Sequence, residues 1–306
     1  MTLRFRTPTN IFLRRAQLVL ILAALVPTIL MSATGVILVV VGQGSVSIVA
    51  GILVLAFCTS SLTGYILVSI FVSRGATVAR VQADFLSSVS HELRTPITSI
   101  RMFIETLRDG RVSDPDEQRK CLRIIGQELE RLDGLVGKLM ELSRVESGRQ
   151  VFEHVLVSVD TLVSNALAGF DAVKLGTEVE VVVDVQPGLQ VLGDPSALGQ
   201  VLSNLLINAW KYSLPDNKQI SIRAFAQKRW VFIDVENNSL GIPLSERQRI
   251  FDTFERGQAA INTGTSGSGL GLAIVRAITR AHGGQVQLTS AGRTTCFRVR
   301  LPHRTH

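Results

Sequence analysis

The stretch Phe85-Leu86-Ser87-Ser88-Val89-Ser90-His91-Glu92-Leu93-Arg94-Thr95-Pro96 decides the fold of the chain's central part. Its apolar residues recur at steps of three and four, the period of an amphipathic helix. His91 lies two residues from Val89 and from Leu93, so it points roughly away from the apolar seam. We expect the helix to bend or loosen at Pro96, which removes a backbone donor. A solvated surface histidine is the plainer interpretation, but a proline one turn away and the adjacent carboxylate of Glu92 favour a nucleophile.

The apolar seam continues beyond this stretch and a second one follows it. Asp109-Gly110 is predicted to end the first helix, and Ser113-Asp114-Pro115 to begin another with a cap and an early proline. The first seam consists of Leu86, Val89, Leu93, Ile97, Ile100, Ile104 and Leu107, the second of Leu122, Ile125, Leu129, Leu132, Leu135, Leu139 and Leu142. A lone hairpin cannot cover both seams, so we expect a homodimer in which two hairpins form a four-helix bundle.

The N-terminal part is apolar enough for a membrane. Residues 16–73 contain no Asp, Glu, Lys, Arg or His, and Gly42-Gln43-Gly44-Ser45 divides them. The halves Gln17–Val41 and Val46–Val72 each exceed the ~20 residues that cross a hydrocarbon core. A two-helix transmembrane hairpin over residues 17–72 is therefore predicted, in preference to a signal peptide or a buried soluble hairpin.

Charge gives the orientation of that hairpin. Arginines precede the first span (Arg4, Arg6, Arg14, Arg15) and follow the second (Arg74, Arg80). The positive-inside rule places residues 1–16 and the C-terminal part in the cytoplasm, which predicts a multi-pass protein of the inner, cytoplasmic membrane. Much of the net charge of +7 is this juxtamembrane arginine, which suits anionic membrane lipid. No nucleic-acid motif accompanies it, and we expect no nucleic-acid partner.

Residues 150–306 read as a separate α+β sandwich, with helices on one face of a sheet. Strands are predicted at Val179–Val185, Gln219–Ala224, Val231–Glu236, Gln285–Thr289 and Cys296–Leu301, and helices at Ser158–Ala168, Ser196–Tyr212 and Gly271–Ala281. In the middle helix, Asn204, Asn208 and Lys211 share one face. Amide oxygens can hold Mg²⁺ and a lysine can meet phosphate, although two structural asparagines would give the same pattern.

A glycine run precedes the last helix: Gly267-Ser268-Gly269-Leu270-Gly271-Leu272. Glycines allow the backbone to approach a phosphate, and the N-terminus of the following helix supplies amides for it. Such a run alone is weak evidence and also fits a flexible loop. The stretch before it, Ile250–Gly257 followed by the small and polar Gln258–Ser266, is typical of a mobile lid.

These motifs resemble those of sensor histidine kinases. His91-Glu92-Leu93-Arg94-Thr95-Pro96 is similar to the H box of that family, and residues 78–147 to its dimerisation and phosphotransfer domain. The resemblance implies that His91 is the phosphoacceptor, that Glu92 orients it and takes its proton, and that Thr95 orients a hydrolytic water. The segment Asn204–Tyr212 resembles the N box, which implies Mg²⁺ on Asn208 and nucleotide contacts from Lys211 and Tyr212.

The remaining motifs match the corresponding boxes of the family to different degrees. Phe251 and Phe254 resemble the phenylalanine box, Arg256 is expected to meet the γ-phosphate, and the run containing Gly267, Gly269, Leu270 and Gly271 resembles the second glycine box. In the first glycine box, Asn237 stands where the family has an aspartate that accepts the adenine amino group. Ser239 replaces a glycine, Gly241 is retained, and Asp234 is off register by three. A neutral acceptor should cost ~1 kcal/mol of ATP affinity, roughly tenfold.

The sequence therefore predicts an ATP- and Mg²⁺-dependent protein-histidine kinase that phosphorylates His91 and passes the group to an aspartate of a cytoplasmic response regulator. A reverse phosphatase activity is also expected. Two alternatives stay open: a pseudokinase membrane scaffold with weak or absent ATP turnover, and a gyrase-like or chaperone-like ATPase. The latter class lacks an H box, so His91–Pro96 argues against it.

The stimulus is expected to arise in the membrane or through another membrane protein. Only about four residues separate the spans, far below the ~40 that an independently folded sensor domain needs. The second span should run almost directly into the His91 helix. Ser60 and Gly64 are small residues at which that span can pack closely against another helix.

Overall fold

The structure is a computed structural model that describes residues 9–174, 176, 178–257 and 267–303, with backbone only for 9–24 and 69–85. It divides into two units, Met1–Asp84 and Phe85–His306, and each is described by itself. The predicted tail at 1–8 and the predicted lid stretch 258–266 lie outside the described residues, as do the side chains of all six juxtamembrane arginines.

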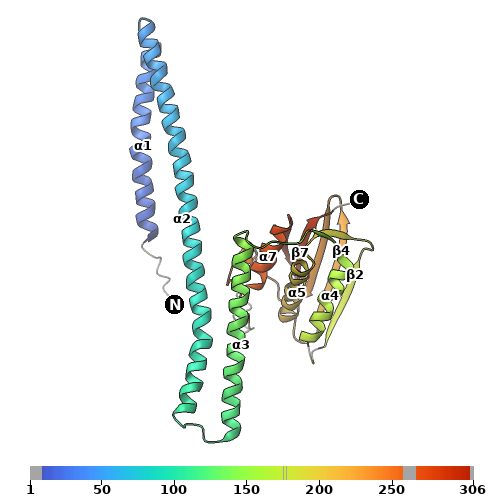
Figure 1. Cartoon of the computed structure of the whole chain (residues 1–306). Coiled ribbons are helices and arrows are strands. Elements are labelled where there is room, and N and C mark those ends of the chain that lie inside the picture. Colours follow the sequence, from blue (N-terminus) through green and yellow to red (C-terminus); the bar gives the residue numbers. More distant parts are fainter. Residues whose placement is uncertain (1–8, 175, 177, 258–266, 304–306) are drawn as a thin grey trace. The chain divides into compact units, whose positions relative to one another are not determined.

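The first unit contains α1 (Thr9–Val40) and the beginning of α2 (Ser45–Arg108), joined by four residues (Figure 1). Among the described residues, one helical segment is long and apolar enough to cross a membrane, Ser45–Val68. In α1 the corresponding apolar segment is Leu25–Val40, which is shorter because the side chains before it are not described. The described apolar segments cover most of the second predicted span and part of the first, and the transmembrane hairpin itself stays a prediction.

Small residues bring α1 and α2 together. A Cβ atom on Gly51 would lie 2.8 Å from the Gly35 carbonyl oxygen and 2.5 Å from Val39 Cγ2, so only glycine fits there. A Cβ on Gly64 would meet nothing within 4 Å. Within the chain, the close approach of α1 and α2 is at Gly51, and packing of Ser60 and Gly64 against another helix stays a prediction.

The second unit begins with a helical hairpin. α2 continues through Pro96 to Arg108, and α3 runs from Pro115 to Glu146. Asp114 caps α3 by accepting a hydrogen bond from the Asp116 amide at 3.1 Å, as its sequence predicts. The proline does not interrupt the helix, so the expected loosening beyond His91 is not visible as a break.

The two predicted seams of the hairpin have different surroundings. Several of their residues remain exposed in the single chain: Leu86, Ile97, Ile104, Leu122 and Leu129. Leu135 and Leu142, in contrast, are buried and belong to the hydrophobic core of the C-terminal domain. Assigning the whole second seam to the dimer was therefore wrong at these two leucines, because the same helix also packs on the catalytic domain.

The C-terminal domain is a sandwich of helices on a sheet (Figure 1). Its main sheet has the order β2-β4-β5-β7-β6, in which β2 pairs with β4 in parallel and the other neighbours are antiparallel. A small antiparallel pair, β1-β3, lies apart from it. The strands are β1 (Val155–Ser158), β2 (Val179–Val185), β3 (Gln190–Gly193), β4 (Lys218–Gln227), β5 (Trp230–Asn238), β6 (Gln285–Ala291) and β7 (Thr294–Pro302). The helices are α4 (Val159–Val173), α5 (Pro195–Tyr212), the 3₁₀ turn η1 (Arg249–Phe251) and α7 (Gly271–Ala281).

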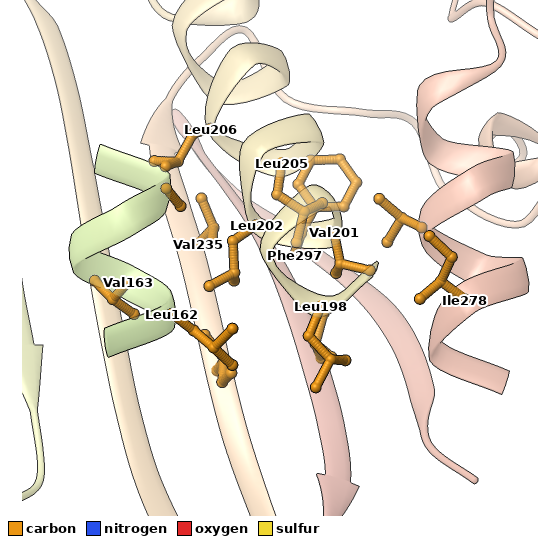
Figure 2. Close-up of a cluster of buried hydrophobic side chains, with 14 of the residues drawn as sticks. Leu162, Val163, Leu198, Val201, Leu202, Leu205, Leu206, Val235, Ile278 and Phe297 are labelled. Atoms are coloured by element: carbon orange, nitrogen blue, oxygen red, sulfur yellow. The ribbon is translucent and has the colours of Figure 1, made fainter. Parts of the chain in front are cut away.

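The core lies between the helices and one face of the sheet. Figure 2 shows α4, α5 and α7 directing apolar side chains at β5 and β7. Residues of β5 alternate, so that Val231, Ile233 and Val235 are buried toward the helices. α5 has the central position, with Leu205 and Leu206 fully buried. This packing fixes the rotation of α5 and thereby the direction in which its polar face points.

Candidate active site

A cleft of about 400 Å³ lies at the polar edge of α5. Ten of the eleven residues predicted to contact a nucleotide line it together: Asn204, Asn208, Lys211, Tyr212, Asn237, Gly241, Arg256, Gly267, Gly269 and Gly271. They come from α5, from the end of β5 with the loop after it, and from both sides of the predicted lid. The fold thus gathers residues that are up to 67 positions apart in the chain into one site.

The wall formed by α5 follows from helical spacing. Asp194 caps the helix by accepting hydrogen bonds from the Ser196 and Ala197 amides, at 2.9 and 3.0 Å. With the leucine face turned to the core, Asn204 and Asn208 are half-buried on the cleft side. Asn204 Nδ2 is buried and has no hydrogen-bond partner within the described residues. A buried donor of this kind in a cleft suits an acceptor such as a phosphate oxygen.

One end of the cleft is positively charged. Burial is the main cause that lowers the pKa of Lys211, and the nearby cations Lys138 and Arg256 lower it further. Burial also raises the pKa of Tyr212, so its hydroxyl keeps its proton as a hydrogen-bond donor. Cations brought close together in one cleft favour a polyanion between them.

The glycine run forms the wall opposite. Gly269 has a φ of +67°, and its carbonyl accepts a hydrogen bond from the Phe254 amide at 3.0 Å. α7 begins two residues later at Gly271, whose added Cβ would come within 3.6 Å of Asn204 Oδ1. The start of a helix and a bare backbone therefore face the polar side of α5, an arrangement typical of phosphate binding.

Leu270 does not line the cleft. Its side chain is fully buried in the hydrophobic core, at 0% exposure. The prediction that Leu270 contacts the cofactor is thus corrected for its side chain, which holds the glycine run onto the domain. The leucine anchors the loop because the glycines on either side of it have no side chain with which to do so.

The other end of the cleft contains Asn237 and Lys218, and the Lys218 ammonium donates to the Trp210 carbonyl at 2.7 Å. Asn237 is only 3% exposed, and its Nδ2 donates to the Asn238 carbonyl at 3.1 Å and to Ser213 Oγ at 3.5 Å. These donations use the amide's nitrogen and leave its oxygen as the acceptor. Ser239 Oγ lies 2.7 Å from Thr295 Oγ1, so the serine that replaces a glycine has a hydroxyl partner.

Asp234 lies on the other face of the sheet. Arg298 holds its carboxylate with two hydrogen bonds, of 2.7 and 2.6 Å, and stacks over Phe225 and Phe232. Strand alternation places residues 234 and 237 on opposite faces. Asp234 accordingly does not line the cleft, and that it does not replace the missing aspartate stays a prediction.

The histidine motif lies on α2 of the hairpin. His91 and Thr95 are exposed on adjacent turns, and Glu92 is half-buried. Within the described residues, no hydrogen bond joins His91 to Glu92. The roles of His91, Glu92 and Thr95 therefore stay predictions. A phosphoacceptor has to be exposed, and His91 is.

Sequence reasoning missed several other residues of the cleft. Among them, Ser213 and Thr295 lie beside Asn237, and Lys138 of α3 lies near Lys211. Ser213 directly follows the Asn204–Tyr212 run, so proximity in sequence could have indicated it. Thr295 and Lys138 are brought in by tertiary packing, and no local pattern marks them.

Two family models match the chain. The model for the His Kinase A (phospho-acceptor) domain matches residues 81–148, and that for the histidine kinase-, DNA gyrase B- and HSP90-like ATPase matches residues 193–305. The first includes the hairpin with His91, and the second includes the cleft. Since both matches occur in one chain, the gyrase-like or chaperone-like alternative, which lacks an H box, does not account for this chain.

Individual relatives agree with the family models. The sensor-like histidine kinase SenX3 of Mycobacterium tuberculosis is 34% identical over 237 residues, which cover 76% of this chain and 57% of SenX3. The chain thus spans somewhat more than half the length of this relative. The solved structure of the Acinetobacter baumannii histidine kinase AdeS is 26% identical with a TM-score of 0.59, covering 70% of this chain and 98% of AdeS. Full-length ShkA in complex with AMPPNP is 25% identical, with a TM-score of 0.54 and coverages of 73% and 46%.

Proposed function

Since the chain belongs to the sensor histidine kinases of two-component systems, we propose that it transfers the γ-phosphoryl group of ATP to its own His91 and then to an aspartate of a response regulator. The observation that carries this proposal is the single cleft in which ten predicted nucleotide contacts meet. The relative ShkA, solved with AMPPNP, supports an adenine nucleotide as its ligand.

The lining of the cleft supports one direction for the nucleotide. Adenine belongs at the Asn237 end, where the Asn237 amide oxygen can accept from its amino group. The phosphates belong between the Asn204–Lys211 face of α5 and the glycine run before α7. Lys211 and Arg256 would neutralise charge that develops on the transferred group.

The residues present also fit Mg²⁺. Amide oxygens are suitable ligands for it, and Asn208 is half-buried within the charged end of the cleft. Asn208 would hold the ion together with oxygens of the triphosphate, and the ion would supply charge neutralisation there. The other protein groups bind and orient: Asn204 donates to phosphate, and Glu92 orients the His91 imidazole and accepts its proton.

Three parts of the proposal concern assembly. The exposed leucine and isoleucine seam of the hairpin supports a homodimer that closes a four-helix bundle. The exposed His91 on that bundle would meet a cytoplasmic response regulator, and Thr95 would help to hydrolyse the regulator's phosphate. Membrane lipid would surround α1 and the first part of α2, with both ends on the cytoplasmic side.

The chemistry can be tested directly. The full chain in lipid nanodiscs is incubated with ATP labelled at the γ-phosphate, and the product is treated with acid and with base. A phosphohistidine is lost in acid and survives base. Label that survives acid, or no label at all in the presence of Mg²⁺, would contradict the proposal.

The membrane hairpin needs a separate test, because one span has only partial structural support. We expect Gln43→Cys, in the turn between α1 and α2, to react with a membrane-impermeant thiol reagent added to intact cells. Ser113→Cys, in the turn between α2 and α3, should react only after the membrane is opened. The native cysteines interfere little, since Cys58 and Cys121 are buried and burial raises the pKa of Cys296 to about 12. Labelling of both variants from outside would overturn the hairpin.

The turn between α1 and α2 also bears on the stimulus. With only residues 41–44 between the helices, no folded domain fits there. We infer that the signal reaches this unit within the membrane or from another membrane protein. Tight binding of a soluble external ligand to the isolated protein, with a changed kinase rate, would contradict this.

A further inference from the structure

One cation of the cleft comes from outside the catalytic domain. Lys138 belongs to α3 of the hairpin and lines the cleft with Lys211 and Arg256. It is three residues after Leu135 and four before Leu142, and these spacings place all three on one face of the helix. The two leucines are buried, at 7% and 1% exposure.

A polar contact fixes the same face of α3. Glu141 Oε2 accepts a hydrogen bond of 2.8 Å from Gln200 Nε2 of α5. Glu141 follows Lys138 by three residues, so the lysine lies between two points at which α3 is held to the catalytic domain. The packing of the hairpin is therefore what brings the Lys138 ammonium into the cleft.

The electrostatic setting indicates what Lys138 can bind. Its charge is felt by Lys211, whose pKa it lowers in addition to the effect of burial. Two carboxylates, Glu246 and Glu255, also line the cleft, and Glu255 is held by Arg249 at 2.7 Å. A multiply charged anion that binds beside Lys138, Lys211 and Arg256 would be attracted by all three cations.

We propose that Lys138 binds the terminal phosphates of the nucleotide while α3 is packed on the catalytic domain, so that nucleotide binding and docking of the hairpin stabilise each other. The reciprocity is thermodynamic: if docking tightens the nucleotide, the nucleotide must tighten docking by the same factor. Lys138 is a positioning residue of the nucleotide site, and its ligands are nucleoside di- and triphosphates. Nucleosides, which lack the charge, should not respond to it. The inference rests on the proposed nucleotide site.

The test compares nucleotide affinities of the full chain in nanodiscs. We expect Lys138→Gln to weaken the binding of ATP and of ADP by about three- to tenfold, which is the range for one partly solvated charge-assisted contact. Adenosine binding, measured by competition, should be equal in the wild type and the variant. Equal adenosine binding would also show that the variant's cleft is intact. Lys138→Arg keeps the charge and should restore most of the affinity. Lys120→Gln makes the same change elsewhere on α3 and should have no effect.

Hydrogen exchange tests the coupling. ATP should slow exchange of the α3 amides around residues 135–142 in the wild type and have a smaller effect in Lys138→Gln. Unchanged ATP affinity in Lys138→Gln, or an equal loss for adenosine, would overturn the inference while ATP binding and the proposed function stand. A wild type that binds no ATP would overturn the proposed function and this inference with it.

Discussion

Gly269 and Phe254 meet backbone to backbone at the edge of the cleft. A Cβ atom on Gly269 would lie 2.6 Å from the Phe254 carbonyl carbon and 2.7 Å from its Cα. Both residues have positive φ values, +67° and +65°. The glycine run and the segment before the lid are thus locked together by a contact that tolerates no side chain. Phe254 adopts a conformation rare for an aromatic residue, which is maintained by its surroundings.

Gly269→Ala should weaken ATP binding at least tenfold and destabilise the catalytic domain by roughly 1–3 kcal/mol, because backbone cannot yield as a side chain can. ATP titration and thermal unfolding measure the two effects. Gly199→Ala is the matched control, since its added Cβ meets nothing within 4 Å and lies inside α5. That change should leave ATP binding intact and stabilise slightly. Equal behaviour of the two variants would show that the Gly269 contact is unimportant.

His91→Gln should abolish self-phosphorylation and leave ATP affinity and the dimer unchanged. Glutamine is polar and suits a helix, so the exposed position tolerates it, but it has no nucleophilic ring nitrogen. Labelling with ATP, nucleotide titration and light scattering provide the three readouts. His154→Gln, a histidine outside the hairpin, should retain the label. Phosphate retained on His91→Gln would mean that another residue is the acceptor.

Thr95→Ala should spare self-phosphorylation and slow dephosphorylation of the response regulator, because Thr95 is exposed one turn from His91. The rates are measured with a purified, phosphorylated regulator. Thr106→Ala removes a hydroxyl from the same helix about three turns further on, where it bonds the Met102 carbonyl. If both variants dephosphorylate the regulator at the wild-type rate, Thr95 has no catalytic part.

The limits of prediction from sequence can be located at particular residues. The periodic elements were predicted well: β2 and α7 have the predicted bounds, and α5 begins one residue earlier. The short strands β1 and β3 were missed, because four residues are too few for a pattern to emerge. At Leu270 the motif names the position without saying where its side chain points, and that side chain is buried in the core.

Leu135, Leu142 and Lys138 show a different limit. A helical period says that a face is apolar and does not say what covers it. In α3 one helix serves two neighbours, the second hairpin expected in the dimer and the catalytic domain that follows in the same chain. Only the packed structure divides the face between them, and it is this division that brings Lys138 to the cleft.

Asp234→Asn should leave ATP affinity unchanged and lower stability by about 1 kcal/mol. The carboxylate lies on the face of the sheet away from the cleft, where it pairs with Arg298. The arginine is 43% exposed, so solvent screens the pair and its contribution is modest. Chemical unfolding and ATP titration separate the two effects. A marked loss of ATP affinity would place Asp234, rather than Asn237, at adenine.

Asn237→Asp is the most informative substitution at the adenine end of the proposed nucleotide site. It should tighten ATP by up to about tenfold, because a charged acceptor replaces a neutral one at the adenine amino group. The gain is opposed by the loss of the Nδ2 donor. In the wild type Nδ2 donates to the Asn238 carbonyl at 3.1 Å, and in the variant a carboxylate oxygen would face that carbonyl instead. We therefore expect the variant to be less stable without nucleotide. The maximal phosphotransfer rate should change little, since the adenine contact is equally present in ground and transition states.

Asn238→Asp makes the same chemical change one residue along the strand and serves as the control. The Asn238 side chain bonds the Asn217 carbonyl and the Gln219 amide and does not line the cleft. Its substitution should alter stability without tightening ATP. ATP is titrated against wild type and both variants. Equal affinities for wild type and Asn237→Asp would mean that residue 237 does not touch adenine. A wild type without measurable ATP binding that Asn237→Asp rescues would instead identify the natural chain as a pseudokinase scaffold, whose first glycine box has lost the acceptor that catalysis needs.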